Sequence, residues 1–144
     1  MTMSDVRTLA RRIADIMLKG EGTGPYWGIR VEDADVGYSK ISMTVREDML
    51  NSHMIAHGGL IFALADTAFA YACNSHNQAA VAQSASIVFT SPVKNGERLE
   101  AEAREVALIG RSGVYAITVK GGDGRVVAQF QGQSRVVGGK IVEE

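Results

Sequence analysis

The sequence predicts an α+β domain in which one antiparallel sheet wraps around a single buried helix. Three observations lead to this prediction: a run that is apolar on all sides and too long for a strand, four strand-like segments after that run, and no linker, repeat or low-complexity tract in 144 residues. A chain of this length is about one domain's worth. We therefore expect a single domain over residues 1–144.

The N-terminal residues 1–20 are expected to form an amphipathic helix. An apolar stripe at helical spacing continues to Met17, with Ser4 as the expected N-cap and Gly20 as the stop signal. Residues 21–25 hold two glycines and a proline, and we expect a loop there.

Two strands are expected between this helix and the centre of the chain, over residues 26–31 and 36–45. In the second of them Ile41 and Met43 alternate with polar residues. Such alternation is typical of a strand with one buried face.

The central run from Leu60 to Cys73 is apolar nearly all round, apart from one acid, Asp66. It is too long for a strand, so we expect a buried helix that begins near residues 57–59. Strands are then expected in the remainder of the chain, separated by turn residues in the manner of an antiparallel meander. They cover residues 79–90, 98–108, 111–120 and 125–137.

The composition argues against several classes of protein. Lys and Arg number 15 and Asp and Glu 16, so the net charge is −1 and no basic face for nucleic acid is indicated. No stretch reaches the roughly 18 apolar residues of a membrane span, and residues 1–20 lack the apolar core of a signal peptide. The single cysteine, Cys73, fits a reducing compartment, so we expect a cytoplasmic protein.

Asp66 is the strongest candidate for chemistry. An ionised carboxylate within an apolar helix loses solvation, which raises its pKa and suits it to act as a base, acid or nucleophile. The alternative is that Asp66 faces solvent or caps a neighbouring loop.

His57-Gly58-Gly59 is the second candidate. The first N–H groups of a helix have no intrahelical partner, and glycine allows a ligand carbonyl to approach them closely, as in an oxyanion hole. The alternative is that the glycines serve backbone geometry and that His57 only caps the helix. Gly58 and Asp66 are eight residues apart, about 12 Å along one helix. If both act on one carbonyl carbon, they come from different subunits, which implies at least a homodimer.

Other candidates carry weaker signals. His53 and His57 have the i, i+4 spacing of a metal pair, but no nearby carboxylate or cysteine completes a set, so no metal site is expected. The turn Arg111-Ser112-Gly113 carries a cation that could meet a nucleotide phosphate; the alternative is a solvated turn.

The spacing Asn51-x5-His57-Gly58-Gly59-x6-Asp66, followed by TAFAYACNS, resembles that of the hotdog-fold thioesterases, and among them the phenylacetate-degradation type that cleaves aryl-acetyl-CoA esters. The resemblance extends from the strand before Asn51 to the C-terminal SRVVGG. It implies a curved antiparallel sheet around one long central helix, dimers whose sheets join, tetramers made of two dimers, and two sites per dimer at the subunit interface.

The resemblance also implies roles for individual residues. Gly58 would donate its N–H to the thioester oxygen, and Asp66 of the other subunit would act as general base or nucleophile. Asn51 and His57 would orient the thioester. Ser84 resembles a serine that assists catalysis in some relatives, although others have a non-polar residue there. Apart from the resemblance, the turn Arg111-Ser112-Gly113 is a candidate for substrate binding, and substrate contacts are also expected from Gly59, Thr67 and Ser84.

The predicted function is hydrolysis of acyl-CoA thioesters without a metal or redox cofactor, with coenzyme A present only as part of the substrate. Two alternatives stay open. A hotdog-type acyl-CoA hydratase would be expected to add a catalytic histidine near its aspartate, and no such segment is evident. A module that binds acyl-CoA without cleaving it would have no need of Asp66.

Overall fold

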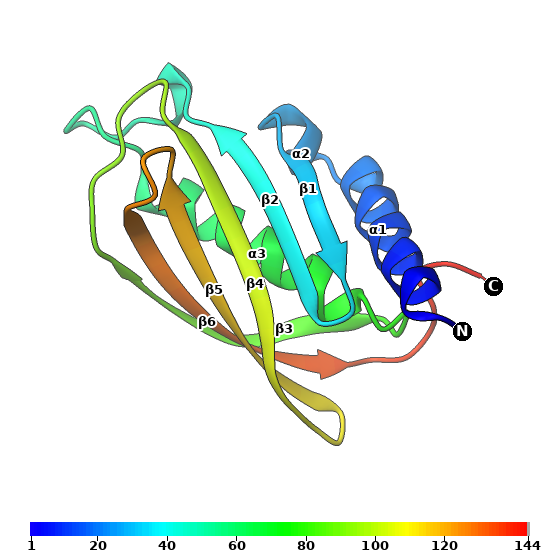
Figure 1. Ribbon diagram of the computed structural model, residues 1–144. Helices are drawn as coiled ribbons and strands as arrows, with labels where there is room; N and C mark the ends of the chain where they lie inside the picture. The colour runs from blue at the N-terminus through cyan, green and yellow to red at the C-terminus, as the bar shows by residue number, and fades with distance from the viewer. Residues whose placement is uncertain (144) are drawn as a thin grey trace.

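A six-stranded antiparallel sheet curves around one long helix in the computed structural model, which describes residues 1–143 (Figure 1). Residue 144, the last of the predicted domain, lies outside the described residues. The strand order is β1-β2-β4-β5-β6-β3, and the predicted α+β architecture is confirmed. The elements in chain order are α1 (Met3–Gly20), α2 (Thr23–Tyr26), β1 (Arg30–Asp35), β2 (Tyr38–Thr44), the 3₁₀ turn η1 (Glu47–Met49), α3 (Gly58–Asn74), β3 (Ala80–Phe89), β4 (Arg98–Ile109), β5 (Ser112–Gly121) and β6 (Val126–Val136).

Helix α1 lies along the outer edge of the sheet beside β1 (Figure 1). Its N-cap is Thr2, two residues before the predicted Ser4, because Thr2 and Asp5 exchange hydrogen bonds in a capping box. The guanidinium of Arg11 donates to the carbonyl oxygen of Val31 at 3.0 Å. The helix therefore covers the edge of β1.

The predictions for residues 21–31 are wrong in part. Residues 23–26 form the short helix α2 instead of a loop, and β1 begins only at Arg30. The N–H of Trp27 donates to the helical turn before it, and Gly28 follows with φ +71°. A strand cannot contain that backbone conformation, which only glycine adopts without strain.

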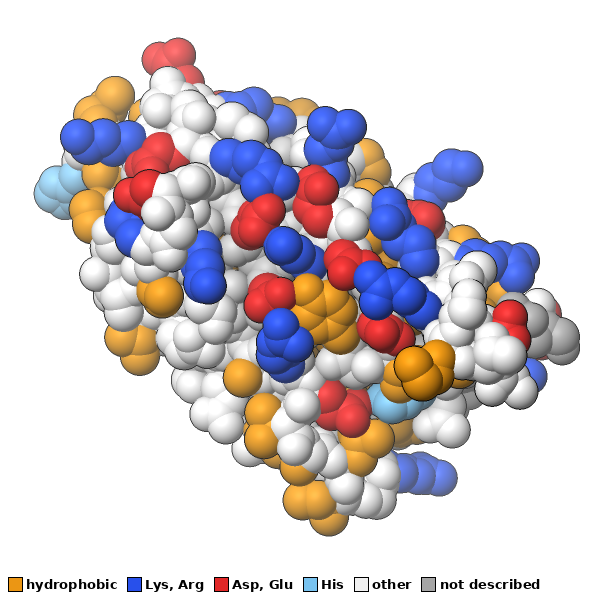
Figure 2. Space-filling view, viewed as in Figure 1, with side chains coloured by type: hydrophobic (Ala, Val, Ile, Leu, Met, Phe, Trp, Pro, Cys, Tyr) orange, Lys and Arg blue, Asp and Glu red, His pale blue; other side chains and the backbone are white. Residues whose placement is uncertain are grey.

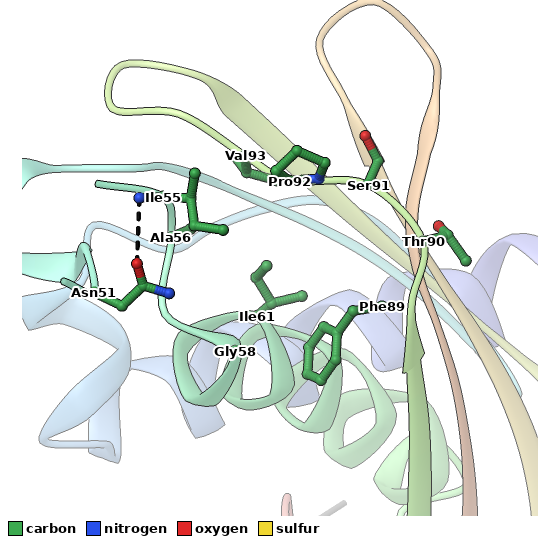
Figure 3. Close-up of a pocket in the computed structure, with 10 residues that line it drawn as sticks. All are labelled: Asn51, Ile55, Ala56, Gly58, Ile61, Phe89, Thr90, Ser91, Pro92 and Val93. Atoms are coloured by element: carbon green, nitrogen blue, oxygen red, sulfur yellow. Dashed lines mark hydrogen bonds between the residues drawn. The ribbon is translucent and has the colours of Figure 1, made fainter. Parts of the chain in front are cut away.

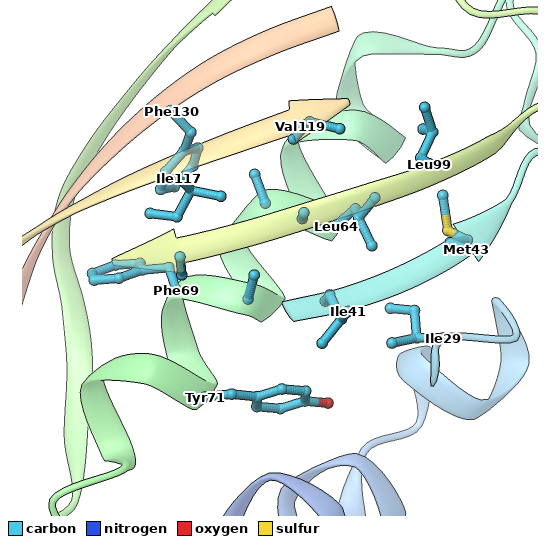
Figure 4. Packing of buried hydrophobic residues seen from close by; sticks show 14 of the residues in the cluster. Ile29, Ile41, Met43, Leu64, Phe69, Tyr71, Leu99, Ile117, Val119 and Phe130 are labelled. Carbon is cyan, nitrogen blue, oxygen red and sulfur yellow. The ribbon is translucent and has the colours of Figure 1, made fainter. Parts of the chain in front are cut away.

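Helix α3 fills the concave face of the sheet and supplies much of the hydrophobic core. Figure 4 shows Leu64, Phe69 and Tyr71 of α3 among buried side chains of the strands. Burial of a large apolar side chain contributes about 1.5–3 kcal/mol, so this packing fixes the helix against the sheet. The strand residues that face it include Ile41, Met43, Leu99, Ile117, Val119 and Phe130.

The predicted meander is confirmed only for β4, β5 and β6. Strand β3 pairs with β6, from Ala80↔Val136 to Phe89↔Ala128, and not with β4. The pairing continues just beyond β3, where the N–H of Thr90 donates to the carbonyl of Val127 near the start of β6, and the chain then leaves this edge and crosses to β4 (Figure 1). As a result β3 is an edge strand, and most of its residues are exposed.

The outer face of the sheet carries many charged side chains. On the outer face acidic and basic side chains interleave over β2 and β4 (Figure 2), for example in the Lys40–Glu100 and Arg98–Glu100 ion pairs. Exposed pairs of this kind contribute little stability. No helix within residues 1–143 is long and apolar enough to cross a membrane.

Candidate active site

A cavity of about 430 Å³ opens at the N-terminal end of α3 (Figure 3). It lies between the loop before α3, the first turns of the helix, and the segment that leaves β3. Most of its lining is apolar. The lining residues are Asn51, Ile55, Ala56, Gly58, Ile61, Phe89, Thr90, Ser91, Pro92 and Val93.

Gly58 is the first residue of α3, and its N–H has no hydrogen-bond partner among the described residues. A Cβ at this position would lie 3.1 Å from Cζ of Phe89. Glycine therefore leaves room in the cavity beside a free backbone donor. A donor at a helix N-terminus can stabilise negative charge on a substrate oxygen.

His57 is the N-cap of α3, as one of the two sequence readings expected. Its Nδ1 atom accepts a hydrogen bond from the N–H of Gly59 at 2.9 Å. The imidazole is exposed. One function of His57 and Gly59 is therefore to hold the first turn of α3, which orients the neighbouring N–H of Gly58.

Asn51 lines the same cavity. Its Oδ1 atom accepts hydrogen bonds from the N–H groups of His53 at 2.9 Å and Ile55 at 3.4 Å. These bonds fix the loop and leave the amide nitrogen of Asn51 on the side of Gly58 (Figure 3). That nitrogen has no hydrogen-bond partner among residues 1–143, so it is available to a ligand.

Asp66 lies in the middle of α3, half-buried, with Phe62 and Ala70 one turn away on either side. No described residue hydrogen-bonds or pairs with its carboxylate. Burial raises the pKa of Asp66 above its ordinary value. An acid that is desolvated without a partner is the group that the sequence predicted at this position.

The two central candidates do not meet within one chain. Gly58 and Asp66 both lie in α3, eight residues and about 12 Å apart along the axis. Asp66 does not line the cavity at Gly58. Instead it lies on a stripe of α3 that the sheet covers only in part, made of Gly59, Phe62, Ala63, Asp66, Thr67 and Ala70.

Two hydroxyl groups that were expected to contact the substrate already donate hydrogen bonds within the protein. The hydroxyl of Thr67 donates to the carbonyl of Ala63 within α3 at 2.7 Å. The hydroxyl of Ser84 donates to Oε1 of Gln133 at 3.1 Å, on the face of the sheet that points away from α3. The roles of Thr67 and Ser84 stay predictions, and this orientation does not favour Ser84.

The turn Arg111-Ser112-Gly113 lines a second cavity, of about 250 Å³, at the opposite end of α3. Cys73 of α3 lies in its wall, and Arg111 itself is exposed. The three residues thus share one cavity, which within one chain is separate from the cavity at Gly58, and their contact with the substrate stays a prediction.

Sequence reasoning missed the apolar wall of the first cavity. Phe89 and Val93 approach the start of α3 only because β3 pairs with β6 and the chain then crosses back over the helix. No local sequence pattern predicts that pairing of strands. No group of three His, Cys, Asp or Glu residues that could hold a metal ion occurs among residues 1–143, and His53 and His57 do not form one.

A family model described as the thioesterase superfamily matches residues 53–128, more than half of the chain. The acyl-coenzyme A thioesterase PaaI of Escherichia coli is 40% identical over 131 residues, covering 91% of this chain and 94% of that protein. The solved structure of the E. coli PaaI protein from the phenylacetic acid degradation operon matches with a TM-score of 0.92 at 38% identity. That match covers 94% of this chain and 98% of that one.

A second solved structure, of a Streptococcus mutans protein bound to acetyl CoA, matches with a TM-score of 0.75 at 26% identity, covering 78% of this chain and 90% of that one. The chain belongs to the thioesterase superfamily, and the predictions of a hotdog fold and a thioester-hydrolysing enzyme are confirmed.

Proposed function

We propose that this protein hydrolyses acyl-CoA thioesters, with an aryl-acetyl group as the preferred acyl group. The observation that carries the proposal is the unpartnered N–H of Gly58 at the mouth of an apolar cavity. Similarity to a thioesterase named for acyl-coenzyme A supports the choice of coenzyme A over an acyl-carrier protein.

The active enzyme is a homodimer, in which two copies of β3 pair along their open edges. Among residues 1–143 strand β3 has a hydrogen-bonded neighbour on one side only, and the partly exposed stripe of α3 lies next to it. An exposed strand edge beside an apolar surface favours pairing with another chain. A dimer of dimers remains compatible with this arrangement.

A two-fold axis at β3 reverses the direction of the second α3 helix relative to the first. The start of one α3 then faces the middle and end of the other. Gly58 of one subunit and Asp66 of the other thereby serve one substrate, which resolves their separation of about 12 Å within a single chain.

Hydrolysis needs a base and an oxyanion donor. A water oxygen attacks the thioester carbon while Asp66 takes the water proton, and the N–H of Gly58 stabilises the negative charge that develops on the carbonyl oxygen. The C–S bond then breaks, and the proton passes from Asp66 to the departing sulfur. Direct attack by the Asp66 carboxylate is the alternative first step.

The first cavity holds the acyl group in this scheme. Ile55, Ile61, Phe89 and Val93 give it an apolar wall, which suits an aromatic ring. Asn51 contributes its free amide to the carbonyl end. Arg111, with Ser112 and Gly113 beside it, faces the nucleotide phosphates.

The proposal requires no metal or redox cofactor, because a thioester is already an activated acyl group. A cytoplasmic location is part of the proposal, since the only cysteine of the chain, Cys73, is buried and unpaired. The hydratase and the non-catalytic binding module are the competing functions. Release of free acid and free thiol from an aryl-acetyl-CoA distinguishes hydrolysis from both.

The shared site can be tested by mixing two inactive variants. Asp66→Asn and Gly58→Pro each disable both sites of their own homodimer. Co-expressed at equal levels, they form mixed dimers in which one site keeps both groups, so roughly a quarter of wild-type activity returns. Mixed dimers that form but stay inactive would contradict the proposal.

A further inference from the structure

The segment between β3 and β4 forms one wall of the cavity at Gly58. Its residues Ser91, Pro92 and Val93 line the cavity opposite the first turns of α3 (Figure 3). The backbone over residues 92–94 is irregular, so strand pairing does not hold it. A wall of this kind keeps its shape only where other contacts fix it.

The guanidinium of Arg125 fixes this wall. Its Nε atom donates to the hydroxyl of Ser91 at 3.0 Å, and its Nη2 atom donates to the carbonyl oxygen of Pro92 at 2.8 Å. No backbone N–H of residues 1–143 donates to that carbonyl. Arg125 does not itself line the cavity. It therefore acts on the wall without contacting a ligand there.

Two carboxylates hold the guanidinium in place. Both oxygens of Glu97 pair with it, Oε1 at 2.8 Å from Nη1 and Oε2 at 3.1 Å from Nη2, and Oδ1 of Asp123 lies 3.0 Å from Nη1. Oε2 of Glu97 also accepts from the N–H of Lys94 at 2.6 Å. The hydrogen bond from Arg125, followed by that from Lys94, lowers the pKa of Glu97, so its carboxylate is ionised at neutral pH. The planar fork of arginine suits such an arrangement, which a lysine cannot reproduce.

The turn between β5 and β6 gives Arg125 a fixed base. The N–H of Gly121 donates to the carbonyl of Arg125 at 3.0 Å, and the N–H of Gly124 donates to the carbonyl of Gly121 at 3.0 Å. A Cβ at Gly121 would lie 2.8 Å from Nη1 of Arg125, so glycine leaves room for the guanidinium. The wall of the cavity is therefore tied to the sheet through this turn.

The same wall reaches the free donor at the start of α3. The carbonyl oxygen of Val93, next to Pro92, accepts a hydrogen bond from the N–H of Ala56 at 2.7 Å, and both Val93 and Ala56 are buried. Ala56 directly precedes His57, the N-cap, and Gly58 follows. A displacement of Pro92 is therefore passed to the first turn of α3 through one hydrogen bond.

We propose that Arg125 is a positioning residue of the active site. It holds the cavity wall at Ser91 and Pro92, and through Val93 it steadies the loop that carries the N–H of Gly58. The inference rests on the proposed function, in which this cavity takes the acyl group. A side chain at the β5–β6 turn thereby governs how well a large acyl group is held.

The kinetic test compares Arg125→Met with the wild type on phenylacetyl-CoA and acetyl-CoA. Methionine keeps much of the arginine stem but has no donor, so the wall loses its support. We expect KM for phenylacetyl-CoA to rise about 10-fold, as for a changed contact in an apolar pocket. Acetyl-CoA, whose acyl group is too short to fill the cavity, should bind as before, and its inhibition constant measures this even if it is not hydrolysed. Equal weakening of both esters would overturn the assignment.

Arg98→Met is the matched control. Arg98 is also a partly exposed arginine that pairs with two carboxylates, those of Glu32 and Glu100, and none of these three residues lines the cavity. It should leave KM for both esters unchanged, whatever it does to the melting temperature. A rise for phenylacetyl-CoA as large as in Arg125→Met would indicate general loosening of the sheet and would contradict the inference.

Glu97→Gln tests the clamp from its other side. Glutamine keeps the size and still accepts from the N–H of Lys94, but it has no charge for Arg125. KM for phenylacetyl-CoA should rise less than in Arg125→Met, and the double variant should be no worse than Arg125→Met alone, because the two side chains act in one contact. Losses that add in the double variant would show that Glu97 and Arg125 act separately, against the proposed clamp.

Amide hydrogen exchange separates this inference from the proposed function, because it needs no substrate. In ligand-free Arg125→Met we expect the N–H of Ala56 to exchange faster than in the wild type and in Arg98→Met, and the amide resonance of Gly58 to shift. These changes would support the inference about the geometry even in a protein that hydrolyses no ester. Unchanged exchange at Ala56 and an unchanged Gly58 resonance in a folded variant would overturn it and leave the hydrolysis proposal standing.

Discussion

The Nδ1 atom of His57 accepts a hydrogen bond from the N–H of Gly59 at 2.9 Å, whereas the neighbouring N–H of Gly58 has no partner among residues 1–143. The side chain of His57, a catalytic candidate in the sequence, is thus tied to the backbone. We expect its effect on the reaction to pass through the position of the neighbouring N–H of Gly58.

Substitution of His57 should separate capping from chemistry. His57→Ala removes the cap and should cost about 1 kcal/mol of stability, with a loss of activity as the first turn loosens. His57→Asn keeps a capping side chain and should keep most of both. Melting temperature and kcat measured together check this. A stable Asn variant with turnover as low as that of Ala would assign the imidazole to the substrate.

Gly58→Pro should remove the oxyanion donor with little damage to the helix. Proline has no N–H and is tolerated at the first position of a helix, and His57 already has the extended backbone that precedes proline. We expect kcat to fall about 10²- to 10³-fold. Gly58→Ala is the control, since it adds a Cβ near Phe89 but keeps the N–H. Equal losses in both variants would point to crowding by the added atoms.

Asp66→Asn should abolish most turnover while the protein stays folded. Asparagine has nearly the same size but cannot take a proton from water or attack as a carboxylate. A fall in kcat of at least about 10²- to 10⁴-fold is expected in single-turnover hydrolysis, with binding of a non-hydrolysable acyl-CoA analogue retained. Near-normal turnover would make Asp66 a structural residue.

The stability of the protein should depend on pH through Asp66. The pKa of Asp66 is about 3.8 in the unfolded chain, and burial raises it in the folded protein. Between the unfolded-state and folded-state pKa values, the folded protein therefore binds more protons than the unfolded one. The stability that this group contributes is present below about pH 3.8 and is lost as the pH rises through the folded pKa. In urea unfolding, the free energy of unfolding of Asp66→Asn should rise relative to that of the wild type as the pH increases across this range. A difference in free energy that stays constant with pH would contradict the raised pKa of Asp66.

Arg111→Ala should raise KM for coenzyme A esters more than for the same acyl group on pantetheine, because only the former carries phosphates near the guanidinium. Arg135→Ala is a suitable control, since Arg135 is exposed and lies on the neighbouring strand opposite Ser112. Equal effects of Arg111→Ala on both thiols would remove it from the nucleotide site.

The sequence was sufficient for the parts of the fold that local periodicity determines. The buried helix around Asp66 and the meander from β4 to β6 have patterns that only one secondary structure satisfies. The partner of β3 could not be predicted, because strand pairing depends on where the chain crosses after Thr90. The orientation of Ser84 is a similar case: a bulge between Ala82 and Ser84 reverses the alternation that starts at buried Ala80.

Candidate residues within a few positions of each other were predictable as a group, as Asn51, His57 and Gly58 show. Phe89 and Val93, which line the same cavity as Asn51 and Gly58, were not predictable. Their position depends on the pairing of β3 with β6, which no local sequence pattern predicts.

Of the two edges of this sheet, helix α1 and the Arg11 side chain cover β1, and within the described part of the chain only β3 is open. A sheet with two open edges can add further chains without limit and grow into a fibre. In the proposed dimer the two β3 edges pair with each other, no open edge is left, and growth of the sheet ends at twelve strands. The covering of β1 by α1 would thereby make the association finite, and we expect loss of that covering to expose the protein to aggregation.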